Sequence, residues 1–151
     1  MASISDYALK QVGYKESAGN ANKYSQELGR PAEAWCADFV VWCAKASGNL
    51  TAILNSASCI EIEMWARKHG YVVPVNLIKR NDLVIFDFSK KGVAEHIGIS
   101  LGYNSNTHLI DTVEGNTSDS QTGSQPNGDG VYLKHRPTSC IRTVIRPKWL
   151  H

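Results

Sequence analysis

The hydrophobic pattern of the chain changes near Asp82, and few folds accommodate such a change. Before this point hydrophobic side chains recur at helical spacing. After it they form short runs rich in β-branched residues, separated by turn residues. Helices followed by a series of strands are typical of an α+β domain. We therefore predict an α+β fold in which N-terminal helices pack on a C-terminal antiparallel β-sheet.

Helix caps and turn residues give the approximate bounds of these elements. Helices are predicted from Ser3 or Ser5 to Val12, over 35–47, and from the capping box at 58–61 to Gly70, with a helical turn near 24–28. Strands are predicted over 83–86, 97–101, 109–113, 131–133 and 141–145. The Ser-, Thr-, Gly- and Asn-rich stretch 115–130 is predicted to be a long exposed loop. With 151 residues and no internal repeat or linker, the chain is expected to form one domain over 1–151.

Composition excludes several classes of function. The net charge is only +2, without the clustered basic face of a nucleic-acid binder. The first six residues lack the basic start and hydrophobic run of a signal peptide, and no stretch approaches the ~20 apolar residues of a membrane span. We expect a protein that is cytoplasmic on synthesis, does not insert into membranes and keeps its four cysteines as free thiols.

Cys36 is the strongest candidate for chemistry. It follows Pro31 and a polar stretch, so it lies at or near the start of the helix over 35–47. Backbone N–H groups and the helix dipole at such a position favour a thiolate and can bind an oxyanion. Cys43 lies inside the same helix and is interpreted as a core residue. Cys59 and Cys140 are interpreted as structural, and whether they meet stays open.

His96 and Glu114 could complete a thiol-hydrolase site. His96 stands directly before a predicted central strand, and Glu114 ends the next strand. A nucleophile, a base and a group that orients the base form the minimal set for this chemistry. Taken alone, Glu114 would be interpreted as a solvated carboxylate at a strand end.

Three blocks of this sequence resemble the signature blocks of CHAP domains, the cysteine- and histidine-dependent amidohydrolases/peptidases of phage endolysins and bacterial autolysins. The blocks are WCADFVVWC at 35–43, HIGI at 96–99 and VEGNT at 113–117. NDLVIFD at 81–87 is also similar, although the family usually has Gly where this chain has Asn81. The resemblance runs from about Tyr7 to Trp149.

The resemblance implies a papain-like α+β fold and cleavage of peptidoglycan amide bonds. Position by position, Cys36 would be the nucleophile, His96 the general base and then acid, and Glu114 the group that orients the imidazole. Asn116 would support the site or the substrate. Some members carry Gln directly before the cysteine as an oxyanion donor, where this chain has Trp35. Some bind calcium, but Lys90 and Lys91 stand where a calcium loop would need oxygen ligands, so no metal or other cofactor is expected.

The predicted function is therefore peptidoglycan hydrolysis by a Cys-His-Glu mechanism, as an N-acetylmuramoyl-L-alanine amidase and/or an endopeptidase of the phage endolysin type. The expected enzyme is a monomer that reaches the bacterial cell wall only through a holin or an export route. Two alternatives stay open: a thiol peptidase or transglutaminase acting on proteins, and a non-catalytic domain that binds the wall. A zinc site has little support, because no C-x-x-C or H-x-x-x-H pairing occurs.

Overall fold

The computed structural model describes residues 2–118 and 128–151. Within these residues there are four α-helices: α1 (Ile4–Lys10), α2 (Lys23–Glu27), α3 (Cys36–Ala46) and α4 (Cys59–His69). The same residues form six strands: β1 (Val72–Val73), β2 (Leu83–Phe86), β3 (His96–Asn104), β4 (Leu109–Thr117), β5 (Gly130–Arg136) and β6 (Ile141–Ile145). The predicted α+β class is confirmed.

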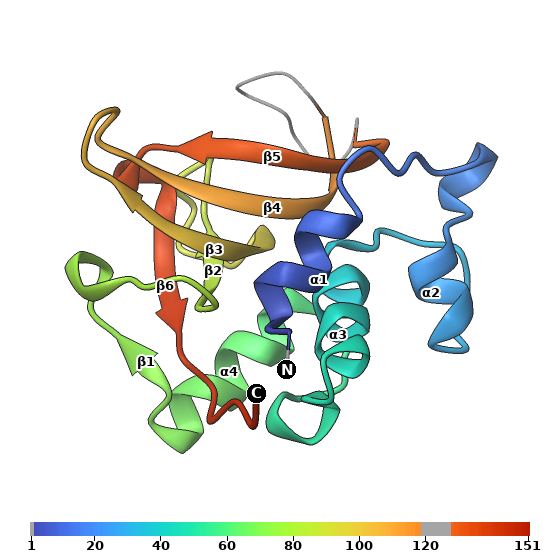
Figure 1. The fold of residues 1–151 in the computed structure, drawn as a ribbon, viewed down its shortest axis with the longest axis horizontal. Coiled ribbons are helices and arrows are strands. Elements are labelled where there is room, and N and C mark those ends of the chain that lie inside the picture. The colour runs from blue at the N-terminus through green and yellow to red at the C-terminus, as the bar shows by residue number, and fades with distance from the viewer. Residues whose placement is uncertain (1, 119–127) are drawn as a thin grey trace.

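The strands form one antiparallel sheet in the order β1-β6-β2-β3-β4-β5. Figure 1 shows α1, α3 and α4 gathered on one side of this sheet, with β5 at its upper edge and β1 at the opposite edge. The hydrophobic core lies between them and includes Phe39 and Val40 of α3 and Ile97 and Ile99 of β3. A central helix and the central strands therefore share one core.

The caps that the sequence predicts are present, with one modification. Ser3 caps α1 in a complete capping box with Asp6. Ser58 caps α4 by accepting from the Glu61 N–H, but the Glu61 carboxylate does not return to the Ser58 N–H. It accepts instead from the Ser56 hydroxyl, at 2.5 Å, and Ser56 Oγ accepts from the Ser58 N–H. Ser56 thus bridges the Glu61 carboxylate and the Ser58 N–H, which a complete capping box would join directly.

Several segments differ from the predictions. The two-residue strand β1 was not predicted, because it is too short to show a periodic pattern. Strands β3 and β4, with nine residues each, and β5, with seven, are longer than predicted. Residues 115–117 belong to β4 and Asn116 and Thr117 are buried, so the prediction of an exposed loop from 115 is wrong there. Residues 119–127 of that predicted loop lie outside the described residues.

Asn81 explains one departure from the family pattern. Its φ of +79° lies in the left-handed region, which glycine adopts without cost and asparagine tolerates better than most residues. Its side-chain oxygen accepts from the Ser5 N–H, and its backbone oxygen accepts from the Trp149 indole. Asparagine therefore keeps the conformation and adds a contact to α1.

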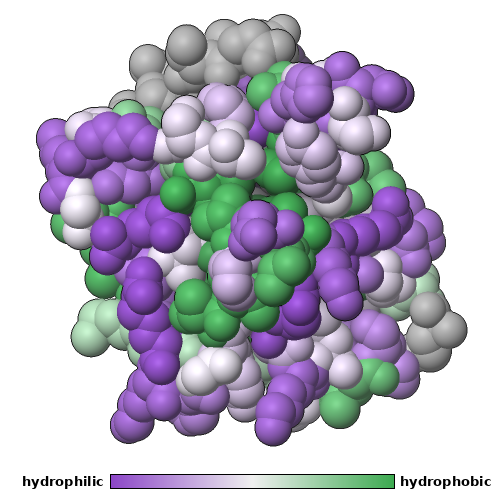
Figure 2. Space-filling model, turned by 90° about the vertical axis from the view of Figure 1, so that its left-hand side faces the viewer, coloured by the Kyte–Doolittle hydropathy of each residue, from purple (hydrophilic) through white to green (hydrophobic). Residues whose placement is uncertain are grey.

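The surface of the described residues is mixed in character. Figure 2 shows the side that faces left in Figure 1, where a hydrophobic area is bordered by hydrophilic side chains. None of the helices in residues 2–118 and 128–151 has the length and hydrophobicity needed to cross a bilayer.

Candidate active site

Cys36 is the first residue of α3, as the sequence predicts, and its side chain is 5% exposed. The preceding Trp35 occupies the N-cap position but makes no side-chain cap. The first N–H groups of an α-helix have no acceptor within the helix, so they can bind an anion that forms beside the sulfur.

Polar contacts to α2 and to the loop after it fix the first turn of α3. The buried Asp38 accepts from Ser25 Oγ of α2 at 2.7 Å and from Arg30 Nη1 at 2.6 Å. Trp35 is buried, stacks on Tyr24 and donates its indole N–H to Glu16 at 3.3 Å. The Trp35 side chain therefore does not replace the glutamine donor of some relatives, and any oxyanion site has to use backbone N–H groups.

His96 is the first residue of β3 and is held by Glu114 of the neighbouring strand β4. His96 Nε2 lies 2.8 Å from Glu114 Oε1, and both side chains are buried. An ionised carboxylate can only accept a hydrogen bond, so Nε2 carries the proton and Nδ1 is the ring nitrogen left to accept one. Within the described part of the chain, Nδ1 has no hydrogen-bond partner.

The structure explains why the block around His96 has glycine at position 98. A Cβ atom at Gly98 would lie 2.6 Å from Cγ of Glu114, which is inside any normal contact distance. Residues 96 and 98 face the same side of β3, because side chains alternate along a strand. The missing side chain at 98 therefore makes room for the carboxylate that holds His96.

Glu114 is more than a strand-end carboxylate, because it is fully buried and ion-paired. It accepts from Arg136 Nη2 at 2.6 Å and Nε at 3.0 Å, and from the Thr112 hydroxyl at 2.5 Å. Burial alone would raise the pKa of Glu114, but the hydrogen bonds and positive charges of His96 and Arg136 lower it to about 2. Glu114 is thus ionised at every pH at which proteins ordinarily work.

Arg136, the last residue of β5, is the site residue that the sequence did not reveal. It is 2% exposed, and a buried arginine almost always requires a carboxylate partner. The available signal was the alternation of β5, which turns Lys134 and Arg136 inward on the same face. The sequence alone does not show which carboxylate they meet.

The sulfur of Cys36 lies beside the start of β3, and within the described residues no hydrogen bond joins it to His96. The sulfur contacts the thiol of Cys59 and the backbone N–H of Ile97, the residue after His96. The helix start was expected to favour a thiolate. Instead the contact with Cys59 and burial raise the pKa of Cys36, and the N–H groups of Ile97 and Ala37 only partly offset them. The thiol is therefore the resting form, and an attack by sulfur needs a base.

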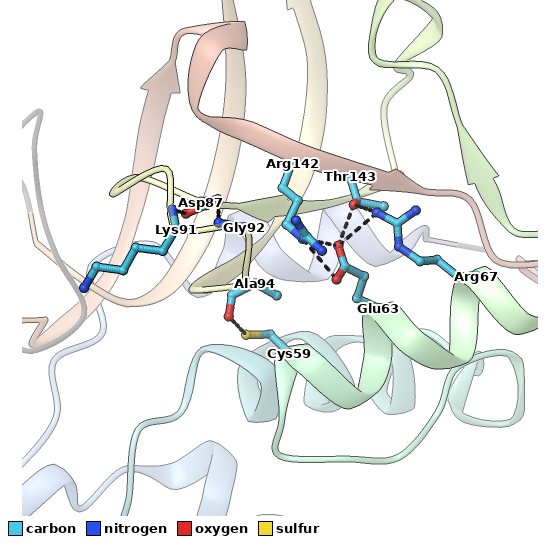
Figure 3. A network of polar contacts seen from close by, with 9 residues as sticks. All are labelled: Cys59, Glu63, Arg67, Asp87, Lys91, Gly92, Ala94, Arg142 and Thr143. Atoms are coloured by element: carbon cyan, nitrogen blue, oxygen red, sulfur yellow. Dashed lines mark hydrogen bonds and ion pairs between the residues drawn. The ribbon is translucent and has the colours of Figure 1, made fainter.

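Cys59 reaches the site because α4 is fixed against the sheet. Figure 3 shows Glu63 of α4 pointing toward Arg142 and Thr143 of β6, with Arg142 Nε 2.9 Å from Oε2 and Thr143 Oγ1 2.5 Å from the same atom. One turn earlier on the helix, Cys59 donates its thiol to the Ala94 oxygen at 3.6 Å, in the segment that leads to His96. All four cysteines are free, as predicted.

Asn116 does not join the hydrogen bonds around His96. It lies at a β-bulge between Glu114 and Thr117, with a φ of +53°. Its side chain is 1% exposed, and within residues 2–118 and 128–151 its Oδ1 has no partner. The preceding Gly115 packs so closely on Phe39 that a Cβ would approach to 2.6 Å. Of the two candidates, Glu114 is thus the one that orients the imidazole.

Two adjoining cavities lie beside the start of α3. One, of about 350 Å³, is lined by Glu33 and Ala34, the residues just before Trp35, and by residues of the 56–61 segment. The other, of about 550 Å³, shares Ser56 and Glu61 with it and extends to Arg30 and Met64. The two cavities thus adjoin each other beside the segment that leads into α3, and neither is lined by Cys36 or His96.

The loop before His96 is occupied by internal contacts. Asp87 accepts from the Lys91 N–H at 3.1 Å and from the Gly92 N–H at 2.8 Å (Figure 3). Among the residues that the structure describes, no three His, Cys, Asp or Glu side chains gather closely enough to hold a metal ion. The expectation that the enzyme needs no metal stays a prediction.

Comparison with known proteins agrees with this geometry. The family model described as CHAP domain matches residues 26–116, more than half of the chain, and this range includes Cys36, His96, Glu114 and Asn116. Neither the curated proteins nor the solved structures gave a significant match, so the papain-like fold stays a prediction. Members of the matched family are generally cysteine- and histidine-dependent amidohydrolases or peptidases. The chain belongs to the CHAP domain family.

Proposed function

We propose that this protein hydrolyses an amide bond of bacterial peptidoglycan, with Cys36 as nucleophile, His96 as general base and Glu114 as the group that orients His96. The observation that carries the proposal is the buried contact of His96 Nε2 with Glu114. It leaves Nδ1 as the acceptor, beside the strand position whose N–H contacts the Cys36 sulfur. A domain that only binds the wall would gain nothing from this arrangement.

In the first half of the reaction, His96 Nδ1 accepts the proton of the Cys36 thiol while the sulfur attacks the amide carbon. Negative charge develops on the amide oxygen, where the free N–H groups at the start of α3 can stabilise it. His96 then donates its proton to the amide nitrogen, the C–N bond breaks and the amine leaves. The product is a thioester on Cys36.

In the second half, water replaces the amine. His96 Nδ1 accepts a proton from the water as its oxygen attacks the thioester carbon. The C–S bond breaks, the carboxylic acid is released and the proton returns to the sulfur. Glu114 stays ionised throughout and stabilises the imidazolium in both halves, because Nε2–H never leaves its carboxylate.

The substrate class follows from the family, because CHAP domains typically act on peptidoglycan. The two cavities lie beside the segment that leads into Cys36 and offer room for parts of such a substrate away from the reacting bond. Amidase and endopeptidase activity remain two forms of the same proposal. They differ only in which amide is placed against Cys36.

Mass spectrometry of the fragments that the purified protein releases from purified peptidoglycan tests the proposal. New amino and carboxyl termini should appear and identify the bond. Cys36→Ala should release none, while Cys43→Ala, a matched change in the same helix, should keep most of the activity.

EDTA should not reduce the rate. Denatured casein serves as a second substrate. Cleavage of casein alone, or full activity of Cys36→Ala, would reject the proposal.

A further inference from the structure

We propose that Arg136 is a positioning residue of this site: its guanidinium holds Glu114 in one orientation and keeps it ionised, so that Glu114 can hold His96. This inference rests on the function proposed above. It adds a residue from β5 that lies outside the range matched by the family model, which ends at residue 116.

The contact between the two side chains has the geometry of a planar two-point pair. Arg136 Nη2 donates to Glu114 Oε1 at 2.6 Å, and Nε donates to Oε2 at 3.0 Å. Two parallel hydrogen bonds fix the plane of a carboxylate as well as its position. Since Oε1 also accepts from His96, the guanidinium determines the direction in which that oxygen faces the imidazole.

Aromatic rings fix Arg136 in turn. Its guanidinium carbon lies 4.7 Å from the ring centre of Phe88 and 5.3 Å from that of Phe86. The ring of Phe86 also stacks on the imidazole of His96, with 5.7 Å between the ring centres. Arg136 and His96 are therefore placed against the same aromatic pair, and a cation over such faces is attracted to them.

The charges around Glu114 show why a cation is needed. Among the described residues, the groups that face it are His96 of β3, Arg136 of β5, the Thr112 hydroxyl of β4 and the thiol of Cys140, in the turn before β6. The hydroxyl is neutral, and the thiol carries no positive charge. Apart from His96, Arg136 is the cation among these groups. Without it, His96 alone of these groups would offset burial with a positive charge, so we expect the pKa of Glu114 to rise.

The protonation state of Glu114 determines which nitrogen of His96 carries the proton. A carboxylate paired with Nε2–H fixes one tautomer, whereas a protonated Glu114 would donate to Nε2 and leave the proton of the neutral ring on Nδ1. Nδ1 could then no longer accept the proton of Cys36. Loss of Arg136 should therefore act through pH and through the tautomer of His96, and not only through stability.

The experiment compares the wild type with Arg136→Gln, Arg136→Lys and the control Arg146→Gln. Arg146, directly after β6, pairs with the buried Asp82 at 2.8 Å, so the control removes a guanidinium from an ion pair outside the site. Initial rates on subsaturating peptidoglycan are measured from pH 4.5 to 8. In parallel, ¹⁵N NMR of histidine-labelled protein reports which nitrogen of His96 carries the proton, which does not require activity.

Arg136→Gln should lose rate toward acid pH more steeply than the wild type, with the ratio of rates at pH 5 and pH 7.5 at least tenfold lower than in the wild type. Its His96 should lose the Nε2–H tautomer. Arg136→Lys should keep the pH profile, because the charge remains, but react more slowly, because the two-point contact is lost. Arg146→Gln should match the wild type in both measurements.

A pH profile and a tautomer unchanged in Arg136→Gln would overturn the inference. If that variant does not fold, Arg136→Lys decides, and a wild-type rate with a wild-type NMR signal would then refute the positioning role. A wild type that does not cut peptidoglycan but shows the Nε2–H tautomer, lost in Arg136→Gln, would reject the proposed function and leave this inference standing.

Discussion

Replacing Glu114 by glutamine tests the core of the site, since it removes one charge and almost no volume. If the amide oxygen of Gln takes the Oε1 position, it accepts from His96 but its NH₂ group faces the Arg136 Nε–H; if it takes the Oε2 position, the NH₂ group faces the His96 Nε2–H. In both orientations the negative charge that stabilises the imidazolium is lost, and in the second the tautomer with the proton on Nε2 has no acceptor. Glu114→Gln should therefore impair the step in which His96 accepts the proton of the thiol.

The magnitude follows from the contacts that are lost. A hydrogen bond to a charged group contributes about 1.5–3 kcal/mol, and about 1.4 kcal/mol corresponds to a tenfold change in rate. We expect kcat to fall roughly ten- to a few-hundred-fold. The variant also removes the carboxylate that pairs with the buried Arg136, and breaking a buried ion pair costs about 3–5 kcal/mol of stability. For a domain of this size that lowers Tm by roughly 6–20 °C.

The assay therefore measures rates well below the Tm of each variant, after circular dichroism has shown that each is folded. Thr112→Val is the matched control, because it removes a neutral donor to Glu114 and should cost less than tenfold. Asn116→Ala should also cost less than Glu114→Gln, since Asn116 has no contact with His96. A nearly silent Glu114→Gln beside an inactive Asn116→Ala would refute this reasoning and move the orienting role to Asn116.

Three further predictions follow from the same contacts. Cys59→Ala removes the contact that contributes most to raising the pKa of Cys36, so iodoacetamide should modify Cys36 at lower pH than in the wild type, as followed by mass spectrometry; an unchanged pH dependence would contradict the contact. Gly98→Ala places a Cβ against Glu114 and should lower kcat at least tenfold in protein that circular dichroism shows to be folded; a wild-type rate would show that Glu114 is not held over Gly98. Because the folded pKa of Glu114, about 2, lies below its ordinary 4.5, its stabilising contribution of about 3 kcal/mol is present above pH 4.5 and is lost between about pH 4.5 and 2. Urea unfolding across this range should show a steeper loss of stability for the wild type than for Glu114→Gln, and parallel curves would reject the assignment.

Much of the site was predictable because its residues lie next to strong local signals. Cys36 follows a polar stretch and begins an amphipathic helix, and His96 and Glu114 stand at the ends of hydrophobic runs. The pairing of these runs in one antiparallel sheet then brings His96 and Glu114 together. Hydrophobic periodicity and the turn residues between successive strands can both be recognised in a sequence.

What could not be predicted depends on side chains that meet across distant segments. In the sequence Arg136 is an ordinary charged residue near a strand end. Only the register of β4 and β5 places it beside Glu114. Cys59 is interpreted as structural from the sequence, and only the position of α4 places it against Cys36. That contact and burial raise the pKa of Cys36 and outweigh the helix-start N–H of Ala37, which lowers it, so the net direction could not be inferred from the helix start alone.

The close packing of Gly115 on Phe39 bears on how the protein acquires activity. These residues are distant in sequence, and β5, which supplies Arg136, follows later still along the chain. Contacts of this kind form late, because the loop between them must first be closed. A chain still emerging from the ribosome has the nucleophile early but lacks the strand that completes the site. Hydrolytic competence should thus be reached only after β5 has been synthesised and has docked on β4.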